Sequence, residues 1–143
     1  MAVVVDDRLL LDVLAGQPQA SVSAELTTGG LFTTSAWYYR LGRAAFSGSG
    51  SGSLSGRLTA FDLAVRERVR SVLQDLPDEI GLLHPRVVVP VMFALRVRRQ
   101  LNVLSAEALA VAMLVRGRLM VTADAPLLRS AAQDLGVEYE ALA

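Results

Sequence analysis

The sequence has no cysteine, no lysine and a single histidine, and aromatic residues make up only 6% of the chain. The lack of cysteine excludes disulfides, thiolate metal sites and a cysteine nucleophile, and it argues against a small secreted scaffold. The one histidine, His84, precedes Pro85 and has no serine nucleophile at a recognisable spacing, so a Ser–His–Asp triad is not indicated. We interpret the exclusive use of arginine as compositional bias.

Long apolar runs are also lacking. No segment approaches the ~20 apolar residues of a membrane span, and the apolar start of the chain reaches Asp6 and Asp7 too soon for the core of a signal peptide. The 14 acidic residues balance the 14 basic ones, so the overall charge indicates no particular partner. We therefore expect a soluble cytoplasmic protein with no membrane partner.

The length of 143 residues and the 52% content of apolar residues suit one globular domain with a substantial core. The segment 47–53 alternates serine and glycine, a composition that cannot order itself by burial. We expect a single domain, 1–143, that carries a flexible surface loop at 47–53.

Strands are expected to alternate with helices along the chain. Val3–Val5 is a short β-branched run, as in a strand buried on both faces of a parallel sheet. The segment 21–34 alternates polar and apolar residues around two glycines and predicts one or two short strands. Further strands are expected at 119–123 and 137–142, a short apolar piece at 80–83, and helices at 8–15, 35–46, 60–76, 89–101, 106–115 and 125–135. This order predicts an α/β fold with three layers, α/β/α, around a central, mainly parallel sheet.

Acidic residues follow two of the expected strands. Asp6 and Asp7 end the first strand and Asp124 follows a later one, while Glu107 lies in the first turn of its helix. Ligands of open parallel sheets bind at the carboxyl ends of the strands, and clustered carboxylates attract hard divalent ions such as Mg²⁺ or Mn²⁺. A second interpretation stays open, because acids at helix starts also serve as caps and complement the helix dipole.

Three segments carry a family resemblance. The opening Val-Val-Val-Asp6, then Leu-Ser-Ala-Glu107-Ala-Leu-Ala, then Leu-Met-Val-Thr122-Ala-Asp124 resemble, in order and separation, the signature of PIN domains, which include the toxin nucleases of bacterial toxin–antitoxin pairs. The resemblance implies a central parallel sheet and a Mg²⁺- or Mn²⁺-dependent ribonuclease that cleaves single-stranded RNA. It also implies a homodimer and an antitoxin or other protein partner. By this resemblance Asp6, Glu107 and Asp124 would be the catalytic metal ligands.

The chain departs from the family pattern in three places. Where a helical glutamate is expected, the chain has Trp-Tyr-Tyr-Arg40. Glu107 replaces an aspartate, and Arg8 stands where a small hydroxyl residue is common. Losing a carboxylate and gaining a guanidinium reduces the charge imbalance that draws in a cation. The second hypothesis is therefore a catalytically inactive PIN-like binding or regulatory module that has lost the full acidic site.

Two further features bear on partners. Trp37, Tyr39, Arg40 and Arg43 share one expected helix and could stack bases and contact phosphates of RNA, although aromatic residues in helices are more often core anchors. The helix 106–115 is mostly apolar, which indicates either near-complete burial or a face given to a second subunit.

Overall fold

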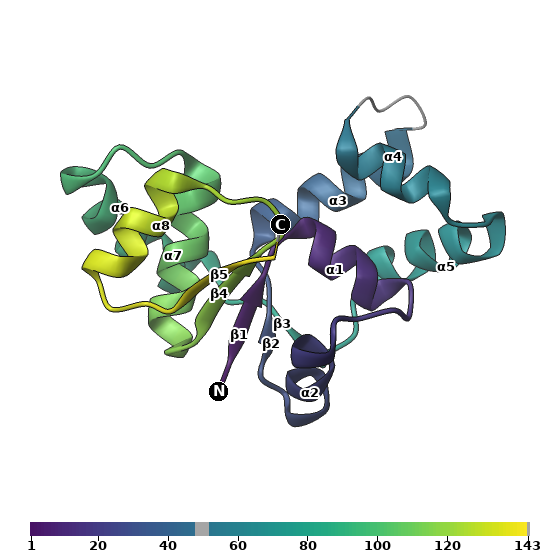
Figure 1. The fold of residues 1–143 in the computed structure, drawn as a ribbon, viewed down its shortest axis with the longest axis horizontal. Coiled ribbons are helices and arrows are strands. Elements are labelled where there is room, and N and C mark those ends of the chain that lie inside the picture. Colours follow the sequence, from purple (N-terminus) through teal and green to yellow (C-terminus); the bar gives the residue numbers. More distant parts are fainter. Residues whose placement is uncertain (48–51, 143) are drawn as a thin grey trace.

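The structure is a computed structural model that describes residues 1–47 and 52–142. Five strands form one all-parallel sheet in the order β3-β2-β1-β4-β5 (Figure 1). The strands are β1 (Val3–Val5), β2 (Leu31–Phe32), β3 (Ile80–Gly81), β4 (Arg118–Val121) and β5 (Tyr139–Ala141). The predicted α/β class with a central parallel sheet is confirmed.

Helices cover both faces of the sheet, with α1–α5 on one side and α6–α8 on the other (Figure 1). The helices are α1 (Asp7–Leu14), α2 (Ala20–Thr28), α3 (Ser35–Ser47), α4 (Ser53–Ala60), α5 (Leu63–Gln74), α6 (Pro85–Arg98), α7 (Val103–Val115) and α8 (Pro126–Asp134). The three predicted layers are therefore present.

The sequence pattern of β1 explains why the sheet is covered on both sides. Side chains alternate between the two faces of a strand. Val3 and Val5 pack into the core under α1 and α5, whereas Val4 packs into the core under α7 and α8. All three valines are 0% exposed, as an uninterrupted apolar strand in a parallel sheet requires.

Helix α2 differs from the sequence-based expectation. Residues 20–28, which we expected to contribute strand, form α2, and Gly29 ends this helix in the left-handed conformation with φ 77°. Only Leu31–Phe32 pairs as a strand in that segment. The serine- and threonine-rich sequence of α2 has the alternation of a strand, but the helix packs on the core through Val22, its one buried residue, and through the partly buried Leu26.

The expected Gly/Ser loop at 47–53 falls mainly outside the described residues, which exclude 48–51. Its two ends belong to helices, because Ser47 closes α3 and Ser53 opens α4. Helix α4 was not predicted from the sequence. Within the described residues, no helix is long and apolar enough to cross a membrane.

Gly117 marks the tightest approach between β1 and β4. A Cβ atom built on this glycine would lie 2.6 Å from the carbonyl oxygen of Ala2, which accepts a hydrogen bond from Arg118 N. Because the obstructing atom belongs to the backbone, it cannot move aside without disturbing the sheet.

We expect Gly117→Ala to lower the free energy of unfolding by about 1–3 kcal/mol, the usual cost of forcing atoms into a packed core. Urea denaturation followed by circular dichroism measures the change. Gly56→Ala in α4 is the matched control, since its Cβ would meet nothing within 4 Å and alanine favours helix. Equal stability of Gly117→Ala and the wild type would contradict the close approach.

Candidate functional site

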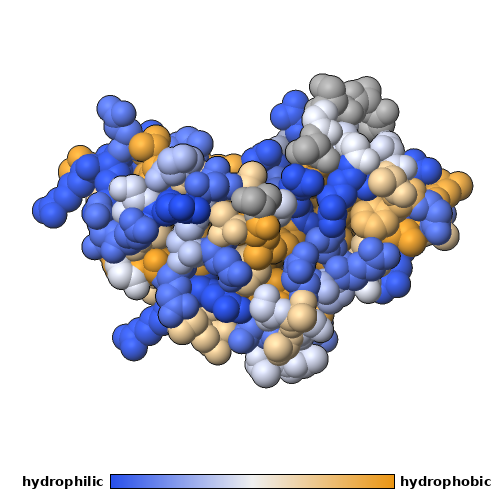
Figure 2. Space-filling view, viewed as in Figure 1, coloured by the Kyte–Doolittle hydropathy of each residue, from blue (hydrophilic) through white to orange (hydrophobic). Residues whose placement is uncertain are grey.

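The carboxyl ends of the strands meet at one edge of the sheet, where the chain places Asp6 after β1, Thr33 and Thr34 after β2, and Thr122 after β4. All four residues are at least partly buried. In Figure 2 the molecular surface is hollowed between the part formed by α6–α8 and the part formed by α3–α5, and this edge lies there (Figure 1). This is the place where open parallel sheets bind ligands.

Asp6 joins three elements at this edge. Its Oδ1 accepts a hydrogen bond from Leu9 N at 3.0 Å, which makes Asp6 the N-cap of α1. Its Oδ2 accepts from Thr122 N at 2.7 Å, and its Oδ1 also lies 3.2 Å from the Thr122 hydroxyl, which donates to it. Next to it, the Thr33 hydroxyl donates to Val5 O at 2.8 Å. Both oxygens of Asp6 are thus already in use by protein donors.

Asp7 is the second buried carboxylate at the edge. It is 5% exposed, and its Oδ2 accepts no hydrogen bond, although Arg40 Nε lies 3.4 Å away and forms an ion pair with it. Burial raises the pKa of Asp7; the Arg40 guanidinium opposes this shift and the neighbouring Asp6 carboxylate adds to it. The guanidinium of Arg40 is therefore the cation that the structure provides for this pair of aspartates.

Glu107 lies on α7, but its side chain contacts the first turn of α3. Its Oε1 accepts a hydrogen bond from Ala36 N at 2.9 Å, across 71 residues of sequence. The Thr34 hydroxyl accepts from Trp37 N at 3.1 Å in the same turn. Free N–H groups in the first turn of a helix need acceptors, and Glu107 supplies one of them. The predicted first-turn position of Glu107 is close to the observed one, but α7 begins earlier and is capped by Asn102.

Asp124 contacts residues of α8 and β5. Its Oδ1 accepts from the Tyr139 hydroxyl at 2.9 Å and lies 3.0 Å from Arg129 Nη2, with its side chain 36% exposed. Arg129 also stacks over the Tyr139 ring at 5.4 Å, and burial is the main reason why the pKa of Tyr139 is raised. The capping role that we considered for Asp124 is wrong, because Ala125 is the N-cap residue of α8 and makes no side-chain capping bond.

The predicted metal ligands are therefore at or near the carboxyl edge, but their oxygens serve other groups. Asp6 caps α1 and binds Thr122, Glu107 binds α3, and Asp124 binds a hydroxyl and a guanidinium. Within residues 1–47 and 52–142, no three His, Asp or Glu side chains are grouped so that they could hold one ion. As they lie here, the three predicted ligands do not converge on one point.

The residues considered for RNA contact fall into two groups. Trp37 is 5% exposed and packs into the core under α6 and α7, so its ring has no free face for a base. Tyr39 is 70% exposed, and Arg43 is exposed as well. Arg40 is held by Asp7. Tyr39 and Arg43 are accessible to a polyanion, and the Arg40 side chain, although paired with Asp7, is 55% exposed as well.

Sequence reasoning missed the partners of the acids. It did not connect Tyr139 with Asp124, or Arg40 with Asp7. Regular spacing along one helix reveals only partners on that helix, whereas the residues of each of these two pairs lie on different elements. The one available signal was the arginine itself, placed on the helix where a carboxylate was expected.

No family model matches this chain, and no curated protein sequence matches it either.

The raised pKa of Asp7 has a consequence for stability. For a carboxyl group with a folded-state pKa above the unfolded value of about 3.9, the contribution to stability is complete below that value and is lost as the pH rises through the folded-state pKa. We therefore expect Asp7→Asn to be at least as stable as the wild type at neutral pH, with an advantage that shrinks as the pH falls below the raised pKa. Urea denaturation across this pH range measures the difference. A neutral-pH loss of stability in Asp7→Asn would show that the Arg40 ion pair outweighs the cost of burial.

Proposed function

We propose that the chain is a PIN-like α/β module that acts by binding a partner, and that its acidic positions now stabilise the fold. The observation that supports this best is Asp6, in which both carboxylate oxygens accept hydrogen bonds from Leu9 N and Thr122. These three hydrogen bonds leave about one of the roughly four lone-pair sites of the carboxylate for a cation, and a buried N–H that lost its acceptor to a metal would cost about 1–3 kcal/mol.

Arg40 supports the same proposal. A divalent ion binds where carboxylates lack enough positive charge around them. Here a guanidinium already lies beside Asp7, on the helix where the family resemblance would place another carboxylate. The second arginine, Arg129, neutralises Asp124 in the same way. Two of the acidic positions therefore have an internal cation.

A Mg²⁺- or Mn²⁺-dependent ribonuclease, with the toxin-like role of its family, is the second candidate. One observation favours it: Asp7 Oδ2 is buried beside Asp6 and accepts no hydrogen bond. Such an oxygen is a natural ligand for a hard cation. In this candidate Asp6, Glu107 and Asp124 would hold the ion after they had released their present partners.

Both candidate functions imply binding partners. A homodimer, an antitoxin or another protein, and single-stranded RNA contacted through Tyr39 and Arg43 are all proposals that rest on the family resemblance and on the exposure of these two side chains. A cytoplasmic location is proposed on the same footing.

Titration calorimetry with Mn²⁺ separates the two candidates. For the binding module we expect no heat of binding at millimolar Mn²⁺, no shift of the melting temperature and no cleavage of single-stranded RNA at high protein concentration. The ribonuclease would bind Mn²⁺, lose this binding in Asp6→Asn and cleave RNA in a chelator-sensitive reaction. Such a result would overturn the proposal.

Arg40→Glu tests whether the Arg40 guanidinium is what prevents a divalent ion from binding. This change removes the guanidinium beside Asp7 and adds a carboxylate at the same place, so we expect Mn²⁺ binding to become measurable in the same calorimetric titration. Arg43→Glu, three residues along α3 and without an ion pair in the described residues, is the matched control and should stay without binding. If neither variant binds Mn²⁺, the Arg40 guanidinium is not what prevents binding.

A further inference from the structure

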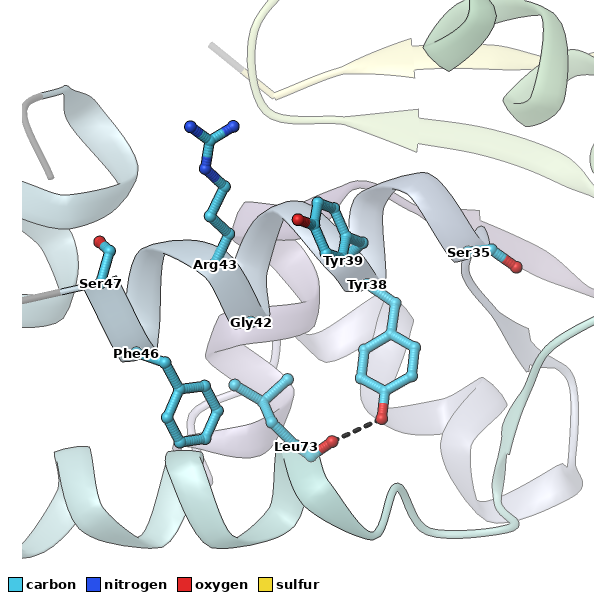
Figure 3. A pocket seen from close by; sticks show the side chains of 8 residues that line it. All are labelled: Ser35, Tyr38, Tyr39, Gly42, Arg43, Phe46, Ser47 and Leu73. Carbon is cyan, nitrogen blue, oxygen red and sulfur yellow. Dashed lines mark hydrogen bonds between the residues drawn. The ribbon is translucent and has the colours of Figure 1, made fainter.

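A hollow of about 580 Å³ crosses the outer surface of α3, away from the acidic edge. We call it the α3 notch and define it by Tyr38, Tyr39, Gly42, Arg43, Phe46 and Leu73. Figure 3 shows Tyr38 and Phe46 on the side of α3 that faces α5, where Leu73 lies, and Tyr39 and Arg43 on the other side. Gly42 lies between the two sides and forms the floor.

Gly42 has no structural reason to be glycine. It lies inside a helix, where glycine costs about 1 kcal/mol relative to alanine, and it does not have a positive φ. A Cβ atom built on it would meet nothing within 4 Å. Glycine is the residue that lets another chain approach a backbone closely. Gly56 in α4 is equally open, so the glycine alone does not mark a site, but between the aromatic side chains of α3 it leaves space in which a group from outside the molecule can approach.

The walls of the notch are fixed and apolar. The Tyr38 hydroxyl donates a hydrogen bond to Leu73 O, which holds this ring against α5 (Figure 3). Phe46 is 49% exposed and Tyr39 is 70% exposed. Exposed aromatic side chains around a small central residue are typical of the anchor pockets in protein interfaces, where a few such contacts supply most of the binding energy.

The charge around the notch is positive. Helix α3 carries Arg40 and Arg43 and no acidic residue. Arg40 is occupied by Asp7, whereas Arg43 is exposed and forms no ion pair in the described part of the chain. A partner with a carboxylate near its apolar anchor would therefore complement this surface, and a basic partner would be repelled.

We propose that the α3 notch binds a helical segment of a partner protein that places an apolar side chain over Gly42 and a carboxylate beside Arg43. The notch is open across the helix, so it would leave most of a small molecule exposed, whereas a helix can lie along the apolar walls. A second copy of this chain is disfavoured, since α3 packed on α3 would bring Arg43 against Arg43. This inference rests on the proposed binding function, but its test involves no metal.

Two short synthetic helical peptides test the proposal by fluorescence anisotropy. One combines leucine with glutamate, and the other has lysine in place of each glutamate. We expect the wild type to bind the acidic peptide at least about tenfold more tightly, a difference of about 1.4 kcal/mol. Added salt should weaken this binding, because screening reduces the attraction of Arg43.

Variants locate the binding surface. Gly42→Leu should weaken binding of the acidic peptide by about tenfold or more, because the added side chain fills the floor. Arg43→Glu is a surface change that should reverse the preference in favour of the basic peptide. Gly56→Leu in α4, where an added Cβ also meets nothing within 4 Å, is the control and should bind as the wild type does. Circular dichroism checks the fold of each variant.

Several results would overturn the proposal. These are no binding of either peptide at millimolar concentration, equal binding of both, or a peptide preference that Arg43→Glu leaves unchanged. Light scattering adds one more: a dimer that Gly42→Leu dissociates would show that a second copy occupies the notch. Because none of these outcomes depends on Mn²⁺, failure here leaves the proposal of a module without metal chemistry standing.

Discussion

The carboxylate of Asp6 is the contact on which the carboxyl edge of the sheet depends. It ends β1, caps α1 through Leu9 N and reaches Thr122 at the end of β4. Asp6 and Thr122 lie 116 positions apart in the sequence, so this one side chain ties the end of β1 and the start of α1 to the end of β4. Because the groups are largely buried, water cannot replace Asp6 as the acceptor, and the geometry of the edge follows from its position.

The same residue illustrates the two roles that a carboxylate at the end of a strand can take. A carboxylate at the end of a strand can coordinate a cation or accept hydrogen bonds from backbone N–H groups, but each lone pair serves one purpose at a time. In this chain the hydrogen bonds are made, and the neighbouring charge of Asp7 is balanced by Arg40. Glu107, one methylene longer than aspartate, reaches Ala36 N on α3. The longer side chain suits this role as a helix cap.

Much of the fold could be predicted from local sequence. The valine run of β1, the amphipathic leucines of α1 before Gly16 and the apolar stretch of α7 can each be recognised from neighbouring residues alone. The prediction failed where local preference was weak. Helix α2 has a serine- and threonine-rich sequence, and α4 contains Gly56 and follows a Gly/Ser segment, so neither shows the periodicity of a helix.

The candidate site could be located but not understood from sequence, because its chemistry depends on which side chains meet across elements. Trp37 shows this for α3. Its neighbours Tyr38 and Tyr39 point to other surfaces, and only the packing of α3 between the sheet edge and α5 decides that Trp37 is buried while Tyr39 is exposed.

Helix α3 is consequently the element that links the edge and the α3 notch. Glu107 caps its first turn and Arg40 ties its middle to Asp7. Two residues after Arg40, Gly42 opens the outer surface. The contacts of Glu107 and Asp7 thus add to the burial of Trp37, Leu41 and Ala45 in holding α3 in place. A helix held rigidly at its N-terminal half presents its aromatic side chains in one arrangement, which lowers the entropic cost of binding at the notch. The two proposals, a module without metal chemistry and a docking surface on α3, therefore depend on the same helix.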